Sequence, residues 1–127
     1  MIIEDNKDIQ DIYKHSFEKA GYEVILEENG LDGINHVAEK LPDVILLDLM
    51  MPKMDGFQFL KELKNNSLNI PVVVCSNISD NEVTTKVLDA GAIAIILKVD
   101  YSGKQLVDKV EYLLDEVGAI KQHTVMH

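Results

Sequence analysis

Five polar side chains stand directly after the apolar runs of this sequence, and their types suit phosphoryl transfer. Glu4 and Asp5 follow the first run, Asp48 the third, Ser76 the fourth and Lys98 the fifth. The carboxyl ends of parallel strands share one edge of a sheet, and ligands bind there. Three carboxylates at that edge repel one another and need a cation, whereas a hydroxyl and an ammonium suit phosphoryl oxygens. The pattern therefore predicts a metal-dependent phosphoryl-transfer site.

Magnesium is the expected cation, because it prefers hard oxygen ligands from one or two carboxylates and retains several waters. We expect Asp5 and Asp48 to bind it directly, and Glu4 to bind it directly or through water. The backbone carbonyl of Met50 is a further expected ligand. The sequence thus predicts a site made of oxygen ligands from two strand ends.

Asp48 is the expected phosphoacceptor. A free oxygen of its carboxylate can attack phosphorus and form an aspartyl phosphate, while Lys98 and Ser76 contact the phosphoryl oxygens. Each residue alone is more often a solvated loop or cap residue. The interpretation depends on their occurring together at successive strand ends.

The elements that must position these residues alternate between two hydrophobic periods. The expected strands are residues 1–3, 22–26, 44–47, 72–75 and 93–97, and the expected helices are 8–20, 31–41, 57–64, 80–90 and 102–117. Five β-α repeats predict an α/β fold: a doubly wound, flavodoxin-like parallel sheet of five strands, order 2-1-3-4-5, with helices on both faces. The first strand is short for a central one, so we expect one or two native residues before Met1.

The composition fits one domain of 127 residues, with 22 acidic and 12 basic side chains and a net charge of −10. This charge argues against direct binding to nucleic acid and to anionic membranes. One cysteine, Cys75, permits no internal disulfide, and no leader or membrane-spanning pattern is present, so we expect a cytoplasmic protein. We expect the domain to cover residues 1–117 and residues 118–127 to form a polar tail.

Four segments together resemble the receiver domains of response regulators in two-component signalling. They are Ile2–Asn6 (IIEDN), Val44–Gly56 (VILLDLMMPKMDG), Pro71–Ser76 (PVVVCS) and Ala90–Lys98 (AGAIAIILK). The acid pair lies about forty residues before Asp48, and Asp48 is followed by Met-Pro and then Asp-Gly; together these features are highly specific. The resemblance extends from about residue 1 to about residue 117.

The resemblance implies that a sensor histidine kinase or a histidine phosphotransfer protein donates a phosphoryl group to Asp48. It implies a domain that is otherwise no enzyme and catalyses, with Mg²⁺, only its own phosphorylation and dephosphorylation. The roles carried over by position are the acidic metal-site pair (Glu4, Asp5), the carbonyl ligand (Met50), the switch hydroxyl (Ser76) and the phosphate-binding lysine (Lys98). We expect a stand-alone receiver that acts on a protein target through the face of its fourth helix, fifth strand and fifth helix, the same face serving any homodimer.

Two positions depart from the usual receiver pattern. Val99 follows Lys98 where receivers usually have a proline, and Ile95 stands three residues before Lys98 where many have a tyrosine or phenylalanine that moves on activation. Tyr101 comes after the lysine and is not an obvious substitute. These departures predict a different loop after the fifth strand and a different way of reading the activated surface.

Three other functions compete with this interpretation. A haloacid-dehalogenase-like phosphatase needs a second Asp two residues after its nucleophile, and Met50 occupies that position. A flavodoxin-like electron carrier needs a phosphate-binding loop after strand one, where the Glu4-Asp5-Asn6 segment would repel the phosphate of FMN. A pseudo-receiver that only docks partners is the third alternative, and the intact set of polar residues argues against it.

Overall fold

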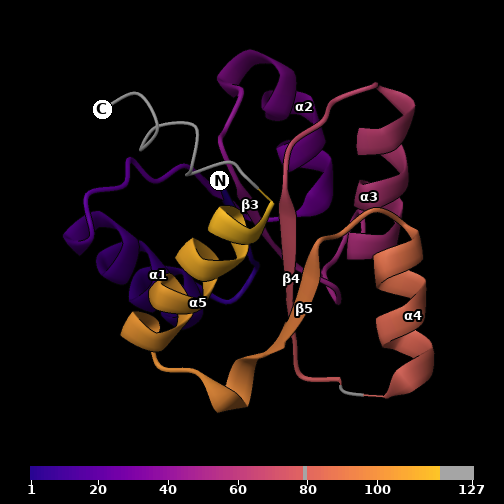
Figure 1. The fold of residues 1–127 in the computed structure, drawn as a ribbon. Helices are drawn as coiled ribbons and strands as arrows, with labels where there is room; N and C mark the ends of the chain where they lie inside the picture. Colours follow the sequence, from indigo (N-terminus) through magenta and orange to yellow (C-terminus); the bar gives the residue numbers. More distant parts are fainter. Residues whose placement is uncertain (79, 118–127) are drawn as a thin grey trace.

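The computed structural model describes residues 1–78 and 80–117 (Figure 1). Its strands are β1 (Ile2–Ile3), β2 (Leu26–Glu27), β3 (Ile45–Asp48), β4 (Val72–Ser76) and β5 (Ala94–Leu97). Its α-helices are α1 (Lys7–Lys19), α2 (Gly30–Lys40), α3 (Gly56–Asn65), α4 (Asn81–Asp89) and α5 (Gly103–Glu116). A single turn of 3₁₀ helix, Lys98–Asp100, joins β5 to α5. The predicted tail, residues 118–127, lies outside the described residues.

The sheet has the predicted topology. Its order is β2-β1-β3-β4-β5, and every pairing is parallel. Helices α1 and α5 cover one face, and α2, α3 and α4 cover the other (Figure 1). The α/β, doubly wound, flavodoxin-like fold is therefore confirmed. Within the described part of the chain, no helix is long and apolar enough to cross a membrane.

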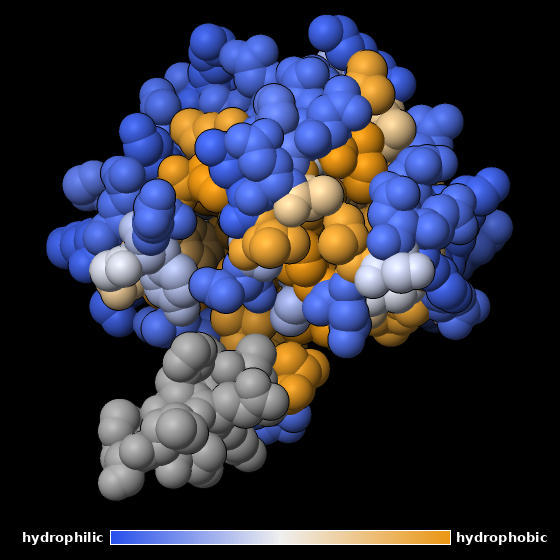
Figure 2. All heavy atoms as spheres, turned by 90° about the horizontal axis from the view of Figure 1, so that it is seen from above, coloured by the Kyte–Doolittle hydropathy of each residue, from blue (hydrophilic) through white to orange (hydrophobic). Residues whose placement is uncertain are grey.

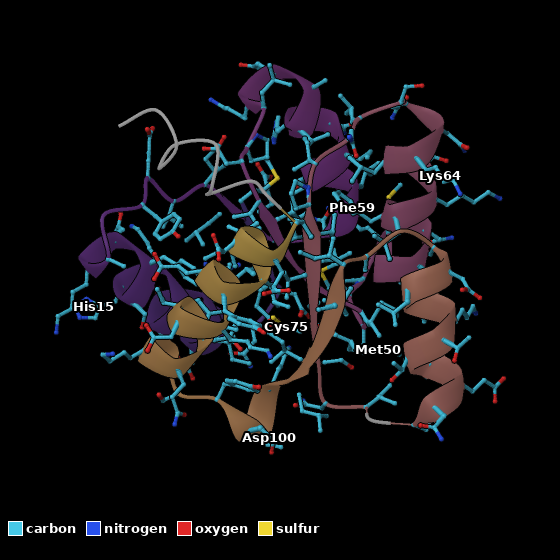
Figure 3. All side chains as sticks on the ribbon, in the orientation of Figure 1. His15, Met50, Phe59, Lys64, Cys75 and Asp100 are labelled. Atoms are coloured by element: carbon cyan, nitrogen blue, oxygen red, sulfur yellow. The ribbon has the colours of Figure 1, made fainter. Side chains whose placement is uncertain are left out.

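The core forms two apolar layers because successive side chains of a strand point to opposite faces. Phe59, which is fully buried, lies between α3 and the sheet (Figure 3). Cys75 lies in the layer between the sheet and α5, and burial raises the pKa of its thiol to about 12. In this position Cys75 acts as a small buried hydrophobe. Both layers leave the strand ends as the places where polar side chains can gather.

Each α-helix begins at a side chain that accepts a hydrogen bond from a backbone N–H of its first turn. The five N-cap residues are Asn6, Asn29, Asp55, Asp80 and Ser102. Such caps contribute about 0.5–2 kcal/mol each. They fix where each loop after a strand ends, and Asp80 and Ser102 are the first residues of the helices expected over 80–90 and 102–117.

Two local features differ from the prediction. The second strand was expected over residues 22–26 but covers only Leu26–Glu27, because its neighbour β1 pairs through Ile2 and Ile3 alone. The 3₁₀ turn after β5 was not predicted in form, although a different loop was expected there. Neither difference changes the topology.

The edge of the sheet opposite the acidic strand ends contains a cavity of about 370 Å³. The cavity lies beside the start of β1. Its lining residues include Val24 and Ile25, which precede β2, and Leu41 and Val44, which precede β3. Figure 2 looks onto this side of the molecule, where apolar side chains reach the surface between hydrophilic ones. The cavity lies at the amino ends of the strands, whereas the polar cluster lies at their carboxyl ends, so the two are separate.

We expect Gly56→Ala to destabilise the fold by about 1–3 kcal/mol, as overpacking in a core does. A Cβ at this position would lie 2.8 Å from Leu49 Cα and 2.9 Å from the Asp48 backbone oxygen, and backbone cannot rotate away. Urea denaturation measures the loss. Lys61→Ala, an exposed change in the same helix, is the control and should stay within about 0.5 kcal/mol; equal stabilities of the two variants would contradict the close packing.

Candidate functional site

The parallel register brings the chemically active side chains to one edge. Ile3 pairs with Leu47, so Glu4 and Asp48 are the next residues on two adjacent strands. Ser76 pairs with Leu97, which places Lys98 one residue beyond the end of β5. The four residues come from strands that are neighbours in space but up to 94 positions apart in the chain.

Three carboxylates form a group at this edge. Glu4, Asp5 and Asp48 each offer an oxygen, and these oxygens all lie within 4.8 Å of one another. Glu4 and Asp48 are 3% and 8% exposed, whereas Asp5 is open to solvent. Two of the three negative charges are therefore shielded from water, which makes their repulsion costly.

Lys98 supplies the compensating charge. Its Nζ lies 2.7 Å from Glu4 Oε1 and 3.2 Å from Asp48 Oδ1, and its side chain is only 10% exposed. A buried ammonium shared by two carboxylates satisfies all three groups. The sequence predicted Lys98 as a phosphate-binding group, and the structure adds its ion pair with Glu4.

The charges in this cluster shift one another's titration. Burial is the main cause that raises the pKa of Glu4, to about 7, with repulsion from Asp48 adding to it and the bond to Lys98 opposing it. Burial alone would lower the pKa of Lys98, but its contacts with Glu4 and Asp48 outweigh this and raise it. Lys98 is therefore the firmly charged member of the cluster.

Ser76 ends β4 with its side chain almost completely buried, 1% exposed. Its Oγ accepts a hydrogen bond of 3.0 Å from the Ile78 backbone N–H. The hydroxyl thus stands at the same strand-end edge as the carboxylates and is tied to the start of the next loop.

Met50 follows Asp48 by two residues, and its side chain is 66% exposed (Figure 3). The carbonyl before it, at Leu49, accepts a hydrogen bond of 2.8 Å from the Gly56 N–H. A direct role of the Met50 carbonyl as a metal ligand stays a prediction.

Gln10 is a residue of the site that the sequence analysis missed. It is buried in α1, and its Nε2 donates a hydrogen bond to the Glu4 backbone carbonyl. The Asn6 backbone N–H donates to Glu4 Oε2 at 3.2 Å, so both contacts hold Glu4 in place. The available signal was a polar residue in line with Tyr13 and Phe17 on the buried stripe of the helix.

A family model described as the response regulator receiver domain matches residues 1–111. The chain belongs to the response-regulator receiver family. This receiver domain is 32% identical over 114 residues to the response regulator SaeR of Staphylococcus aureus (strain USA300), a match that covers 90% of this chain and 49% of SaeR. It thus spans about half the length of the curated relatives it matches.

Solved receiver structures share the fold. The Francisella response regulator 1452 receiver domain is 28% identical with a TM-score of 0.83, covering 91% of this chain and 95% of that one. The receiver domain of a signal transduction histidine kinase from Syntrophus aciditrophicus is 30% identical with a TM-score of 0.78, covering 91% and 89%. The resemblance inferred from the sequence is confirmed, and with it membership of two-component signalling.

Receiver domains bind Mg²⁺ at an acidic pocket, and the residues of this one fit that ion. The cluster offers hard carboxylate oxygens within reach of one another, the ligand type that Mg²⁺ prefers. The exposed side chain of Asp5 leaves one flank of the group open to solvent, as a metal that keeps several waters requires.

We expect Lys98→Met to lower the free energy of unfolding by about 3–5 kcal/mol without metal, because two buried carboxylates lose their cation. Saturating Mg²⁺ should then raise the melting temperature of this variant more than that of the wild type, since a metal binding only the folded state restores the missing charge. Thermal denaturation with and without Mg²⁺ measures both effects.

Lys104→Met is the matched control, because Lys104 is 86% exposed in a helical pair with Asp108. Its stability and Mg²⁺ response should resemble those of the wild type. A Lys98→Met protein with the same Mg²⁺-induced shift as the wild type would show that the ammonium and the metal do not compensate the same charges.

Proposed function

We propose that this receiver domain accepts a phosphoryl group on Asp48 from a sensor histidine kinase or a histidine phosphotransfer protein. The observation that carries the proposal is the ion pair between Asp48 and Lys98 inside a carboxylate cluster at the carboxyl edge of the sheet. An acceptor carboxylate, a cation for the phosphoryl oxygens and a set of metal ligands thus stand together in a few ångströms. Receivers as a family interact with histidine kinases, which supports the class of donor.

In the proposed step, a carboxylate oxygen of Asp48 attacks the phosphorus of a phosphohistidine. The new P–O bond forms as the P–N bond breaks, and the bonding electrons leave with the imidazole, which takes up a proton. Lys98 and the Ser76 hydroxyl contact the oxygens of the transferred group, where negative charge gathers. A Mg²⁺ held by Asp5, Asp48, the Met50 carbonyl and Glu4, the last directly or through water, would add further positive charge.

The domain acts as a signalling element and is proposed to catalyse only its own phosphorylation and dephosphorylation. We keep residues 1–117 as its extent, since α5 ends at Glu116. Its output is proposed to be a contact with a downstream protein, or a homodimer, through α4, β5 and α5. The cytoplasmic location and the absence of direct contacts with nucleic acid or membrane stay predictions.

Intact-protein mass spectrometry after incubation with a small phosphodonor and Mg²⁺ tests the acceptor. We expect the mass of one added phosphoryl group, lost on removal of Mg²⁺ and absent in Asp48→Asn. Asp43→Asn, an exposed change beyond the other end of β3, should be phosphorylated like the wild type. A folded wild-type protein that takes up no phosphoryl group would favour the docking-only alternative.

Phosphorylation should change amide exchange on the output face. We expect altered exchange rates in α4 and β5 and at the start of α5, because Ser76 stands before the segment that leads into α4, and Lys98 directly follows β5 and begins the segment that leads into α5. Helices α2 and α3 serve as the internal reference and should exchange at unchanged rates. Equal exchange everywhere in protein shown by mass to be phosphorylated would exclude this face as the output surface.

A further inference from the structure

Gln10 is the polar member of the buried stripe of α1, whose other buried residues are Tyr13 and Phe17. Its side chain is only 6% exposed. Burying an amide is costly unless the amide is hydrogen-bonded, and an apolar residue of similar length would fit the stripe without that requirement. The amide at this position is therefore expected to have a task beyond packing.

The acceptor of the Gln10 hydrogen bond is the backbone carbonyl of Glu4. This carbonyl belongs to the peptide unit that joins Glu4 to Asp5, and a peptide unit is planar. The carbonyl oxygen and the Cα atom of Asp5 therefore move together. By holding the oxygen, Gln10 fixes the plane from which the Asp5 side chain starts.

The second peptide unit beside Asp5 is tied as well. The Asn6 backbone N–H, which belongs to the unit between Asp5 and Asn6, donates to Glu4 Oε2 at 3.2 Å. Two fixed planes on either side of one Cα atom determine both backbone dihedral angles of that residue. The backbone direction at Asp5 is thus set by Gln10 on one side and by the Glu4 carboxylate on the other.

Regular secondary structure does not supply this constraint. Glu4, Asp5 and Asn6 form the short connection between β1 and α1, and neither element includes them. The Glu4 N–H donates to the Glu27 carbonyl at 3.0 Å, but that N–H belongs to the preceding peptide unit. The Asp5 side chain itself is exposed. Its carboxylate therefore depends on the backbone beneath it for its direction.

The two ties respond differently to a metal ion. The Glu4 carboxylate is itself an expected ligand, directly or through water, so Mg²⁺ competes for the oxygens that hold Asn6. The Gln10 amide is neutral and bonds to a carbonyl that is not among the expected ligands, so it keeps its contact when the metal binds. Groups that orient metal ligands in this way typically account for about 10–100-fold in metal affinity.

We infer that Gln10 is a positioning residue of the metal site: its amide holds the Glu4–Asp5 peptide plane so that the Asp5 carboxylate is presented to Mg²⁺. The inference rests on the proposed role of Asp5 as a metal ligand. It assigns to α1 a part in metal binding that is separate from the residues that touch the ion. Asp5 provides the oxygen, and Gln10 reduces the conformational freedom that Asp5 would otherwise lose on binding.

Gln10→Met removes the amide and keeps the length of the side chain. Isothermal titration calorimetry of the unphosphorylated protein with Mg²⁺ measures the affinity directly, and we expect the dissociation constant to rise about tenfold. The Mg²⁺ concentration that gives half the maximal rate of phosphorylation by a small phosphodonor should rise by the same factor. The maximal rate should change by less than about twofold, because the groups proposed to act on the phosphoryl group are untouched.

Gln58→Met is the matched control. Gln58 is exposed on α3, where its Oε1 accepts a hydrogen bond of 3.2 Å from the Asp55 backbone N–H. This variant also loses a hydrogen bond made by a glutamine side chain, but that bond holds no expected metal ligand. Its dissociation constant for Mg²⁺ should equal that of the wild type. An equal loss of affinity in both variants would mean a general destabilisation and would overturn the role of Gln10.

NMR of the metal-free protein tests the positioning itself. The order parameter of the Asp5 backbone N–H should fall from about 0.85 in the wild type to below about 0.6 in Gln10→Met. The side-chain amide protons of Gln10 in the wild type should exchange slowly with solvent, which is a test that needs no variant. Rapid exchange of these protons, or an unchanged Asp5 order parameter in the variant, would overturn the inference.

The outcomes separate this inference from the proposed function. A Gln10→Met protein that binds Mg²⁺ as tightly as the wild type overturns the role of Gln10 and leaves Asp48 as the acceptor. A wild-type protein that binds no Mg²⁺ overturns the metal site, and this inference with it. Phosphorylation of Asp48 is decided independently by the intact mass.

Discussion

The contact on which this structure depends is the ammonium of Lys98 held between Glu4 and Asp48, 2.7 and 3.2 Å away. Strands β1 and β3 lie side by side in the middle of the sheet and both end in a buried carboxylate. Without a cation these ends would repel each other in an environment that water screens poorly. The charge of Lys98, which directly follows the edge strand β5, therefore allows two carboxylates to lie next to each other at the ends of the central strands.

In this arrangement, the ion pair that stabilises the unphosphorylated domain opposes binding of a phosphoryl group by the same lysine. The charge that stabilises the strand ends is the same one that a phosphoryl group would attract, so the incoming ligand competes with an existing ion pair. A phosphoryl group can shift the domain from its resting to its activated state only if it makes better contacts in the activated one. The segments that would respond to the exchange are the loops after β1, β3, β4 and β5, which carry the charged residues and the Ser76 hydroxyl.

Most of the fold could be predicted from the sequence because its strands are continuous apolar runs, each ending in a polar residue of distinct type. Val72–Ser76 is an example in which both the strand and its terminal hydroxyl were evident. The limits of the second strand were not, because pairing length depends on what the neighbouring strand offers, and that is a tertiary property. Gln10 was missed for a related reason. The sequence shows that Gln10 lies on the apolar stripe of its helix, but it does not show that the amide bonds to the Glu4 backbone carbonyl. The ion pair of Lys98 with Glu4 joins residues 94 positions apart, and no local signal encodes such a distance.

Cys75 has a practical consequence for studying this protein. It is the single cysteine of the chain, it is 2% exposed, and burial raises the pKa of its thiol to about 12. Alkylation requires the thiolate as the nucleophile, and a buried thiol with a raised pKa offers almost none. The native cysteine is therefore expected to stay unreactive toward thiol-directed labels. One new surface cysteine can carry a spectroscopic dye or spin label at a chosen position, with no need to replace the native residue and disturb the layer under α5.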